Sequence, residues 1–288
     1  MKALTIRQFF KAFPDDDSCL EHVFRCRFGQ DYDCPKCEKS TKWHKLQSER
    51  AYSCQYCGHH LHPTVGTLFE KSRTPLQLWF YAIYLFTATR HGVSGKELQR
   101  QLGVTYKTAW RMGHEIRKHM GEIDGDEPLS GHVEIDEVFI GGKRKGRGNR
   151  SNKIVVVGMI QRDGDVMTKV VTDSKKTSLL PVVQENIEAG STVSTDENRA
   201  YHDLEELGYE HGTVRHSARE YKNGIHHTNA IEGYWHILQA SIASTHMHVS
   251  KKHLPKYLGE FEYRHNTRSN PSQMFPELIS TYSEPDSK

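Results

Sequence analysis

Val133-Glu134-Ile135-Asp136 is a short β-branched run that ends in an aspartate, and Val193-Ser194-Thr195-Asp196 repeats that pattern further along the chain. Val, Ile and Thr favour strands, so each run predicts a core strand that delivers an acid at its end. A third acid, Glu232, follows 36 residues after Asp196, in a segment with apolar residues at helical spacing. Carboxylates on two strand ends and a later helix match the oxygen ligands of a two-Mg²⁺ phosphoryl-transfer site.

From residue 132 onward the pattern of the chain is α/β. Apolar runs and their periodicity predict strands at 133–140, 153–160, 166–171, 192–195 and 213–215, and helices at 177–189, 200–207, 228–241 and 254–265. Three consecutive antiparallel strands, a crossover helix and a parallel fourth strand describe a ribonuclease H-like mixed sheet. In that architecture the first strand is central with the fourth beside it, so Asp136 and Asp196 meet at neighbouring strand ends.

The third ligand has two candidates. Asn229 and Glu232 are three residues apart and therefore share one face of the predicted helix. Either side-chain oxygen could complete the site, and we favour Glu232. The other nearby acids, Glu134 and Glu137 among them, are interpreted as solvated carboxylates that point away from Asp136.

Two Cys-x-x-Cys pairs stand 16 residues apart, and they consist of Cys34, Cys37, Cys54 and Cys57. Each pair can form a knuckle that aims two sulfurs at one tetrahedral centre, so two knuckles joined by a hairpin predict a ribbon that binds one structural Zn²⁺. The mean hydropathy is −0.71, and no apolar stretch is long enough for a signal peptide or a membrane span. We therefore expect a cytoplasmic, nucleoid-associated protein, in which thiols stay reduced and favour metal over disulfides.

Residues 94–117 have the pattern of a helix-turn-helix. Ser94 and Glu97 have capping-box spacing before a short helix, Gly103 makes the turn, and Thr105 caps a longer helix. The side chains that would face a DNA groove are Tyr106, Lys107 and Arg111. The alternative is an ordinary helical hairpin whose basic face is solvated.

A basic run adds a second candidate contact with DNA. The net charge of +3 is weak by itself, but five cations fall within eight residues: Lys143, Arg144, Lys145, Arg147 and Arg150. Phosphate contacts dominate the affinity of proteins for DNA, so we expect this run to track the DNA backbone.

These segments together resemble the insertion-sequence DDE transposases with an N-terminal zinc ribbon, the ISXO-like group of relatives of the Merlin transposases. The resemblance runs through both Cys pairs and through residues 133–142, 194–201, 227–235 and 252–268. It implies a ribonuclease H-like catalytic domain with two Mg²⁺ or Mn²⁺ ions. It also implies recognition of terminal inverted repeats in double-stranded DNA by a homodimer or higher oligomer. Family members vary in the third metal-site residue, so Glu232 and Asn229 both stay open.

The expected organisation is multidomain α+β, with a helical lead-in (1–31), the zinc ribbon (32–70), a helix-turn-helix (71–121), a linker (122–131), the catalytic domain (132–275) and a tail (276–288). The first functional hypothesis is an active transposase. The alternative is a catalytically silent DNA-binding regulator or relic, and a plain ribonuclease H-type nuclease would leave the N-terminal modules unexplained. The three acids favour the transposase, because a pure binding protein does not need them.

Overall fold

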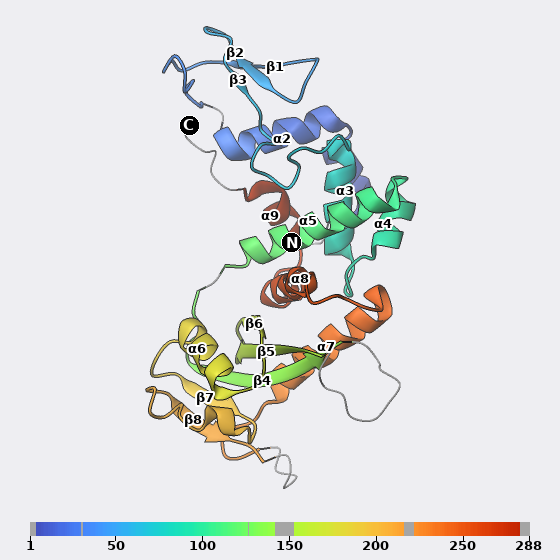
Figure 1. Cartoon of the computed structure of the whole chain (residues 1–288). Coiled ribbons are helices and arrows are strands. Elements are labelled where there is room, and N and C mark those ends of the chain that lie inside the picture. Colours follow the sequence, from blue (N-terminus) through green and yellow to red (C-terminus); the bar gives the residue numbers. More distant parts are fainter. Residues whose placement is uncertain (1–3, 30, 126, 142–152, 216–221, 283–288) are drawn as a thin grey trace. The chain divides into compact units, whose positions relative to one another are not determined.

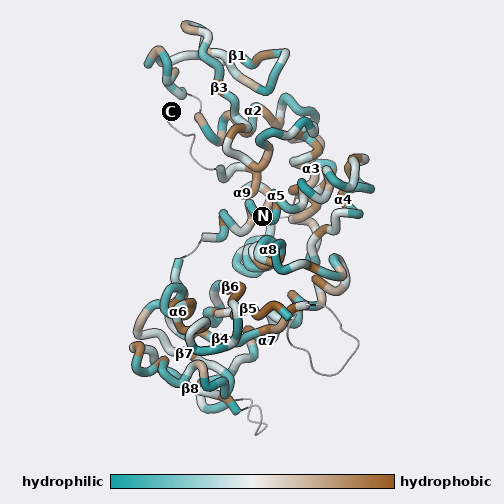
Figure 2. The backbone as a smooth tube through the Cα atoms, viewed as in Figure 1, coloured by the Kyte–Doolittle hydropathy of each residue, from teal (hydrophilic) through white to brown (hydrophobic). Residues whose placement is uncertain are grey.

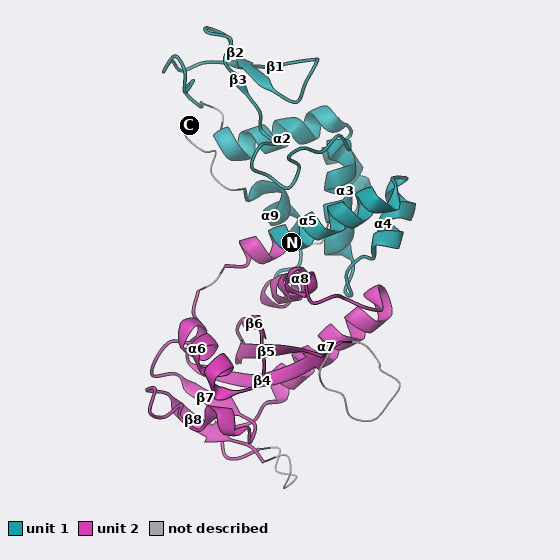
Figure 3. Cartoon of the chain, in the orientation of Figure 1, with its two compact units in different colours: residues 1–119, 270–288 teal, residues 120–269 magenta. Residues whose placement is uncertain are grey.

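The chain divides into two compact units (Figure 3). The computed structural model describes residues 4–29, 31–125, 127–141, 153–215 and 222–282 (Figure 1). The first unit holds residues 1–119 and 270–288, and the second holds residues 120–269. The basic run that contains Lys143, Arg144, Lys145, Arg147 and Arg150 lies outside the described residues.

Helices make up most of the first unit. They are α1 (Ile6–Ala12), α2 (Asp16–Phe28), α3 (Leu76–Ala88), α4 (Gly95–Leu102), α5 (Tyr106–Ile123), whose last turn belongs to the second unit, and α9 (Met274–Ser280). The tail expected at 276–288 begins inside α9, which packs against α2 and α3. Burial of Phe275 and Leu278 explains this return of the chain to the first unit.

Local capping sets the boundaries of α4 and α5. The Ser94 hydroxyl accepts a hydrogen bond from the Glu97 amide at 3.0 Å, and Gly103 ends α4 in the left-handed conformation with φ of 65°. The Thr105 hydroxyl accepts from the Thr108 amide at 3.3 Å at the start of α5. The two helix starts expected from the sequence are therefore confirmed.

A small antiparallel sheet positions the second cysteine pair, because Cys54 ends β2 and Cys57 lies between β2 and β3. Its strands are β1 (Trp43–Lys45), β2 (Tyr52–Cys54) and β3 (His60–Leu61), in that order. The ring of Tyr52 stacks on Phe24 of α2 with 4.2 Å between centroids, which anchors the sheet on the helix.

The second unit is built on a mixed five-stranded sheet. Its strands are β4 (His132–Ile140), β5 (Ile154–Gln161), β6 (Val166–Val171), β7 (Thr192–Thr195) and β8 (Glu210–Thr213), in the order β6-β5-β4-β7-β8. β4 is antiparallel to β5 and parallel to β7. The expected order, with the first strand central and the fourth beside it, is confirmed. β8 begins earlier than expected because Glu210 pairs with Thr192 of β7.

Helices cover both faces of this sheet. The helix α6 (Lys176–Asn186) packs on one face, and α7 (Asn229–Ser241) and α8 (Leu254–Asn266) pack on the other. Neighbouring residues of β5 belong to opposite layers, since Val157 joins the α6 side and Val156 joins the α7 and α8 side. A strand buried on both faces has hydrophobic residues at nearly every position, and Figure 2 shows such a run along β5.

The prediction of a helix at 200–207 is wrong. The chain forms a 3₁₀ turn, η2 (Arg199–Tyr201), followed by further turns up to Gly208, whose φ is 89°. Tyr201 and Leu204 are three residues apart and both completely buried, which suits the three-residue repeat of 3₁₀ geometry. Among the helices that the structure describes, none combines the length and the hydrophobicity needed to cross a membrane.

Candidate functional site

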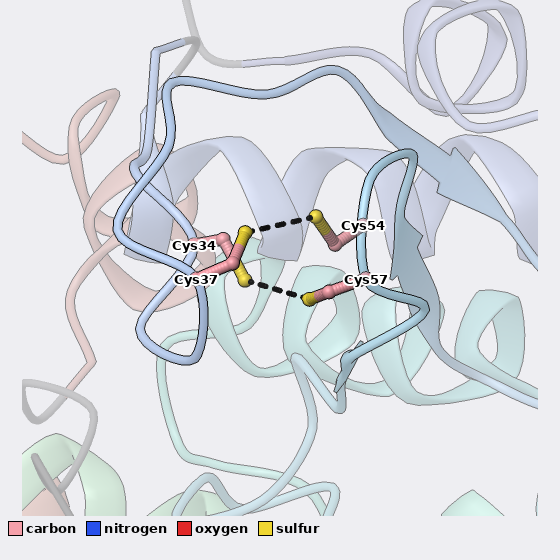
Figure 4. A group of neighbouring side chains, drawn as sticks. All are labelled: Cys34, Cys37, Cys54 and Cys57. Carbon is pink, nitrogen blue, oxygen red and sulfur yellow. Dashed lines mark hydrogen bonds between the residues drawn. The ribbon is translucent and has the colours of Figure 1, made fainter.

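Four cysteines converge in the first unit. The Sγ atoms of Cys34 and Cys57 are 3.5 Å apart, and those of Cys37 and Cys54 are 3.8 Å apart (Figure 4). All four sulfurs lie within 4.8 Å of one another. A tetrahedral zinc shell with Zn–S bonds of about 2.3 Å separates its sulfurs by about 3.8 Å, so the arrangement fits Zn²⁺.

The second knuckle favours a thiolate at Cys54. The Tyr56 amide donates to Cys54 Sγ at 3.4 Å, and Gly58 takes a φ of 69° that few other residues adopt. Burial raises the pKa of the Cys54 thiol, but hydrogen bonds with Thr41 and the amides of Cys57 and Tyr56 outweigh it and lower the pKa to about 6. Among the residues that the structure describes, no histidine joins this group, so its four potential ligand atoms are all cysteine sulfurs.

The two aspartates lie on adjacent parallel strands of the second unit. Pairing between β4 and β7 ends with Glu134 opposite Ser194, and each aspartate stands two residues beyond that pair. β4 continues to Ile140, as the strand predicted at 133–140 requires, because β5 pairs with it that far. Asp136 therefore lies within the strand and not at its end. Asp136 and Asp196 therefore flank the point at which β7 leaves the sheet.

The third acid approaches from the helix that covers this face. Val138 of β4 packs in one core with Ile231 and Trp235 of α7, and Asp136 lies on the same face of the strand as Val138. Burial, followed by the negative charges of Glu137, Asp196 and Glu232, raises the pKa of Asp136 to about 7. The carboxylates thus repel one another across three different elements of the fold.

These acids influence one another by charge, but their carboxylate oxygens do not converge on one point. Among the described residues, the cysteines alone place three or more potential ligand atoms within 4.8 Å of one another. Glu232 and Asn229 are both exposed in the first turn of α7, and the Thr228 hydroxyl donates to Glu232 Oε1 at 2.8 Å. The structure therefore links Asp136, Asp196 and Glu232 by charge and leaves the choice between Glu232 and Asn229 open.

The interpretation of Glu134 and Glu137 as solvated acids is wrong. Glu134 is completely buried, and it lies on the same face of β4 as Asp136 because the two residues are two positions apart. Glu137 faces the other way, where burial raises its pKa although Tyr201 and Asn198 donate hydrogen bonds to it. Both acids belong to the surroundings of the site.

Gly158 is a further residue of the site that the sequence analysis missed. It pairs with Asp136 in the β4–β5 register. A Cβ atom at this position would lie 2.4 Å from the Trp235 ring and 2.9 Å from Ile231. The absent side chain therefore lets α7 approach the sheet beside Asp136. A glycine inside an apolar strand is the sequence signal for such a close approach.

The helix-turn-helix side chains expected to contact DNA are exposed in the first unit. Tyr106, Lys107 and Arg111 all lie on the first half of α5. A groove beside them is lined by Lys107, Arg111 and Trp110 together with Lys71 and Arg73 from the segment before α3. Because these cations come from two separate segments, the basic surface is wider than the sequence indicated.

Known proteins resemble this chain over both units. Residues 128–266 match the family described as ISXO2-like transposase domain, and residues 14–60 match the transposase zinc-ribbon domain. An uncharacterised protein in the transposable element ISH50 of Halobacterium salinarum is 27% identical, over 91% of this chain and 95% of that protein. An uncharacterised transposase-like protein of Haemophilus influenzae is 29% identical over 109 residues, which are 38% of this chain and 87% of that protein. The chain belongs to the ISXO2-like DDE transposases of insertion sequences, with an N-terminal zinc ribbon.

Proposed function

We propose that this chain is an active transposase. It binds the terminal inverted repeats of its insertion sequence, hydrolyses the phosphodiester at each end and joins the freed 3′-hydroxyl to target DNA. The observation that carries the proposal is the half-buried Asp136, whose raised pKa reflects its partial burial and the charges of Asp196 and Glu232. Acids that repel one another lower stability, so a regulator that never cuts DNA gains nothing from this cluster.

The acids fit two Mg²⁺ or Mn²⁺ ions. Their donor atoms are carboxylate oxygens, with the Asn229 amide oxygen as the alternative third ligand, and hard divalent cations prefer such ligands. Divalent cations would also relieve the repulsion that raises the pKa of Asp136. Ions bound there would activate the attacking oxygen and neutralise charge on the leaving oxygen.

The chain's own groups orient these ligands. The Asn198 amide donates to Asp196 Oδ1 at 2.9 Å, which holds that carboxylate just after β7. The Thr228 hydroxyl does the same for Glu232. Water is the nucleophile in the first step and a DNA 3′-hydroxyl in the second, so no side chain is assigned a covalent role.

Fold-level features support the same proposal. The order β6-β5-β4-β7-β8, with a parallel pair next to an antiparallel meander, is typical of a ribonuclease H-like domain. The succession of α4, a left-handed Gly103 and α5 supports a helix-turn-helix. We further propose a dimer or higher oligomer on DNA, because transposition must hold two ends of one element together.

The test is metal-dependent nicking of a labelled duplex that carries the element's end, run beside a gel shift on the same DNA. We expect binding without metal and nicking only with Mg²⁺ or Mn²⁺. Binding without nicking in either metal would support the silent regulator, and nicking of a scrambled duplex at the same rate would support a plain nuclease. Inverted repeats in the DNA that flanks the reading frame supply the sequence of the probe.

Replacement of each candidate third ligand separates the two alternatives. Glu232→Gln keeps the size of the side chain but removes its charge, so we expect a larger loss of nicking than in Asn229→Ala. Loss of a residue that stabilises charge in the transition state costs about 10²–10³-fold in rate. Nicking rates at saturating Mn²⁺ provide the comparison, and a larger loss in Asn229→Ala would assign the third ligand to Asn229.

The basic run 143–150 is proposed to contact DNA phosphates. Neutralising Lys143, Arg144 and Lys145 together should lower the slope of log affinity against log salt by about 0.9 for each lost contact. The control is Lys175→Gln with Lys176→Gln, because these two exposed cations already lie near Asp173 and Asp203. Gel shifts across a salt series measure the slope. An unchanged slope in the triple variant would make the run a solubilising segment.

A further inference from the structure

We propose that Glu134 is a positioning residue that holds the N-terminus of α7, and with it Glu232, against the strands that carry the two aspartates. The inference rests on the proposed function, because it assigns Glu134 a role in assembling the same metal site. Glu134 itself is no ligand in this proposal, since its oxygens are already occupied by other groups of the chain.

The first turn of α7 is capped from the sheet. Thr228, the N-cap residue, makes no side-chain capping hydrogen bond. Glu134 Oε2 instead accepts from the amides of Ala230 at 2.8 Å and Ile231 at 3.3 Å. A carboxylate at a helix N-terminus satisfies orphan amides and interacts favourably with the helix dipole. Because this cap comes from β4 two residues before Asp136, it sets the distance between that strand and the helix turn that bears Glu232.

A single guanidinium secures the segment that leads into α7. Arg162 Nε donates to Glu134 Oε1 at 2.8 Å, and the Arg162 side chain also donates to the carbonyls of Ile225 at 2.7 Å and His227 at 3.3 Å. His227 Nδ1 lies 3.0 Å from Glu134 Oε1, although its geometry is not that of a hydrogen bond. The planar fork of arginine reaches all these acceptors at once, which a lysine cannot do.

The same network extends to the strand that delivers Asp196. Arg162 can only donate, so His132 Nδ1 accepts from it at 3.0 Å and His132 Nε2 donates to the Ser194 hydroxyl at 2.8 Å. The Ser194 hydroxyl also forms a hydrogen bond of 2.9 Å with His226 Nδ1. Ser194 lies on β7 two residues before Asp196. One hydrogen-bond network thus joins β4, β7 and the first turn of α7, the elements that carry or immediately precede the three acids.

Stability alone is a poor reason for this arrangement. Burying a carboxylate and a guanidinium costs desolvation energy, and a well-packed apolar pair is often as stable. Glu134 is completely buried and the Arg162 side chain is 22% exposed, so this cost applies here. A network that connects the elements of three ligands does have a function, because outer groups orient the residues that bind a metal.

The test compares Glu134→Gln with a matched variant, Glu260→Gln. Glu260 is also completely buried in the second unit and pairs with Arg264 at 2.8 Å, but that pair lies within α8. In Glu134→Gln the side-chain NH₂ group would face the backbone amides of α7 or the Arg162 guanidinium, which are also donors, so the cap on α7 weakens. Two quantities are measured for each full-length protein: the Mn²⁺ concentration for half-maximal nicking, and the Mn²⁺ concentration for half of the metal-induced rise in Tm.

We expect Glu134→Gln to raise both Mn²⁺ concentrations by about 10- to 100-fold, as for other groups that orient metal ligands. Glu260→Gln should leave them unchanged even if it lowers Tm. Unchanged Mn²⁺ dependence in Glu134→Gln, or an equal shift in Glu260→Gln, would overturn the proposal. If Glu134→Gln does not fold, Arg162→Lys tests the proposal instead. Loss of the guanidinium fork should raise both Mn²⁺ concentrations, and unchanged concentrations would refute the positioning role of Glu134.

Failure of the proposed function would look different. A wild-type protein that binds Mn²⁺ but never nicks DNA would contradict the transposase activity, while the Tm measurement would still decide the role of Glu134. A wild-type protein whose Tm does not respond to Mn²⁺ would refute the positioning role itself.

Discussion

Asp136→Asn or Asp196→Asn is expected to abolish nicking of the inverted-repeat duplex, with a loss of about 10²–10³-fold or more in rate. Each change removes the negative charge of a proposed metal ligand while keeping the size of the side chain. Binding of the same duplex should stay within about twofold, since the basic groove of the first unit is untouched. Nicking assays with Mg²⁺ and with Mn²⁺, beside a gel shift, measure the two properties separately.

The control for this pair is Asp165→Asn, which removes an exposed carboxylate from the turn between β5 and β6. It should nick like the wild type. Nicking that persists in Asp136→Asn would remove the metal-site interpretation. Loss of binding and nicking together would point instead to an effect of the aspartates on folding.

Asp136→Asn should also stabilise the metal-free protein, and the size of this effect should depend on pH. The pKa of Asp136 is raised from 3.8 to about 7, so the folded state binds more protons than the unfolded state between these values. The free energy of unfolding therefore falls as pH rises through that window. Asp136→Asn abolishes this effect, so its Tm should equal that of the wild type near pH 4 and exceed it above pH 7.

Melting curves in the presence of a chelator measure this difference. One kcal/mol corresponds to roughly 2–4 °C in a protein of this size range. Excess Mn²⁺ at pH 8 should raise the Tm of the wild type and leave Asp136→Asn almost unchanged. An equal response of both proteins to Mn²⁺ would place the binding of that ion elsewhere.

Cys54→Ser is expected to lower the zinc content from one equivalent to nearly none. Structural Zn²⁺ contributes about 10–16 kcal/mol to the folding of small zinc domains, so the ribbon should unfold without it. Cys54 shares its strand with Tyr52, whose ring stacks on α2, and that contact should loosen as well. Elemental analysis gives the zinc content, and proteolysis between residues 30 and 70 reports the unfolding.

Cys26→Ser is the matched control, because Cys26 is exposed and does not belong to the four-cysteine group. It should retain one equivalent of zinc and resist proteolysis like the wild type. Equal zinc in Cys54→Ser and the wild type would contradict a four-cysteine site, and so would a wild type without zinc.

The sequence by itself determined the features that depend on neighbours along the chain. Cys-x-x-Cys spacing is enough to predict a knuckle, and four cysteines do converge. Ser94, Gly103 and Thr105 act within one helical turn, so the boundaries of α4 and α5 could be predicted. The β-branched runs before Asp136 and Asp196 likewise predicted their strands, and the ribonuclease H-like succession of strands and crossover helix predicted the order of the sheet.

Tertiary structure alone decided which acids are buried and what they contact. Strand periodicity does put Glu134 on the face of Asp136, but its burial depends on α7 and Arg162, which lie 28 or more residues away in the chain. The 3₁₀ turn that brings Tyr201 to Glu137, the start of β8 and the return of α9 to the first unit have the same origin. In each case the free energy comes from burial and hydrogen bonds between distant segments, which no local pattern of residues records.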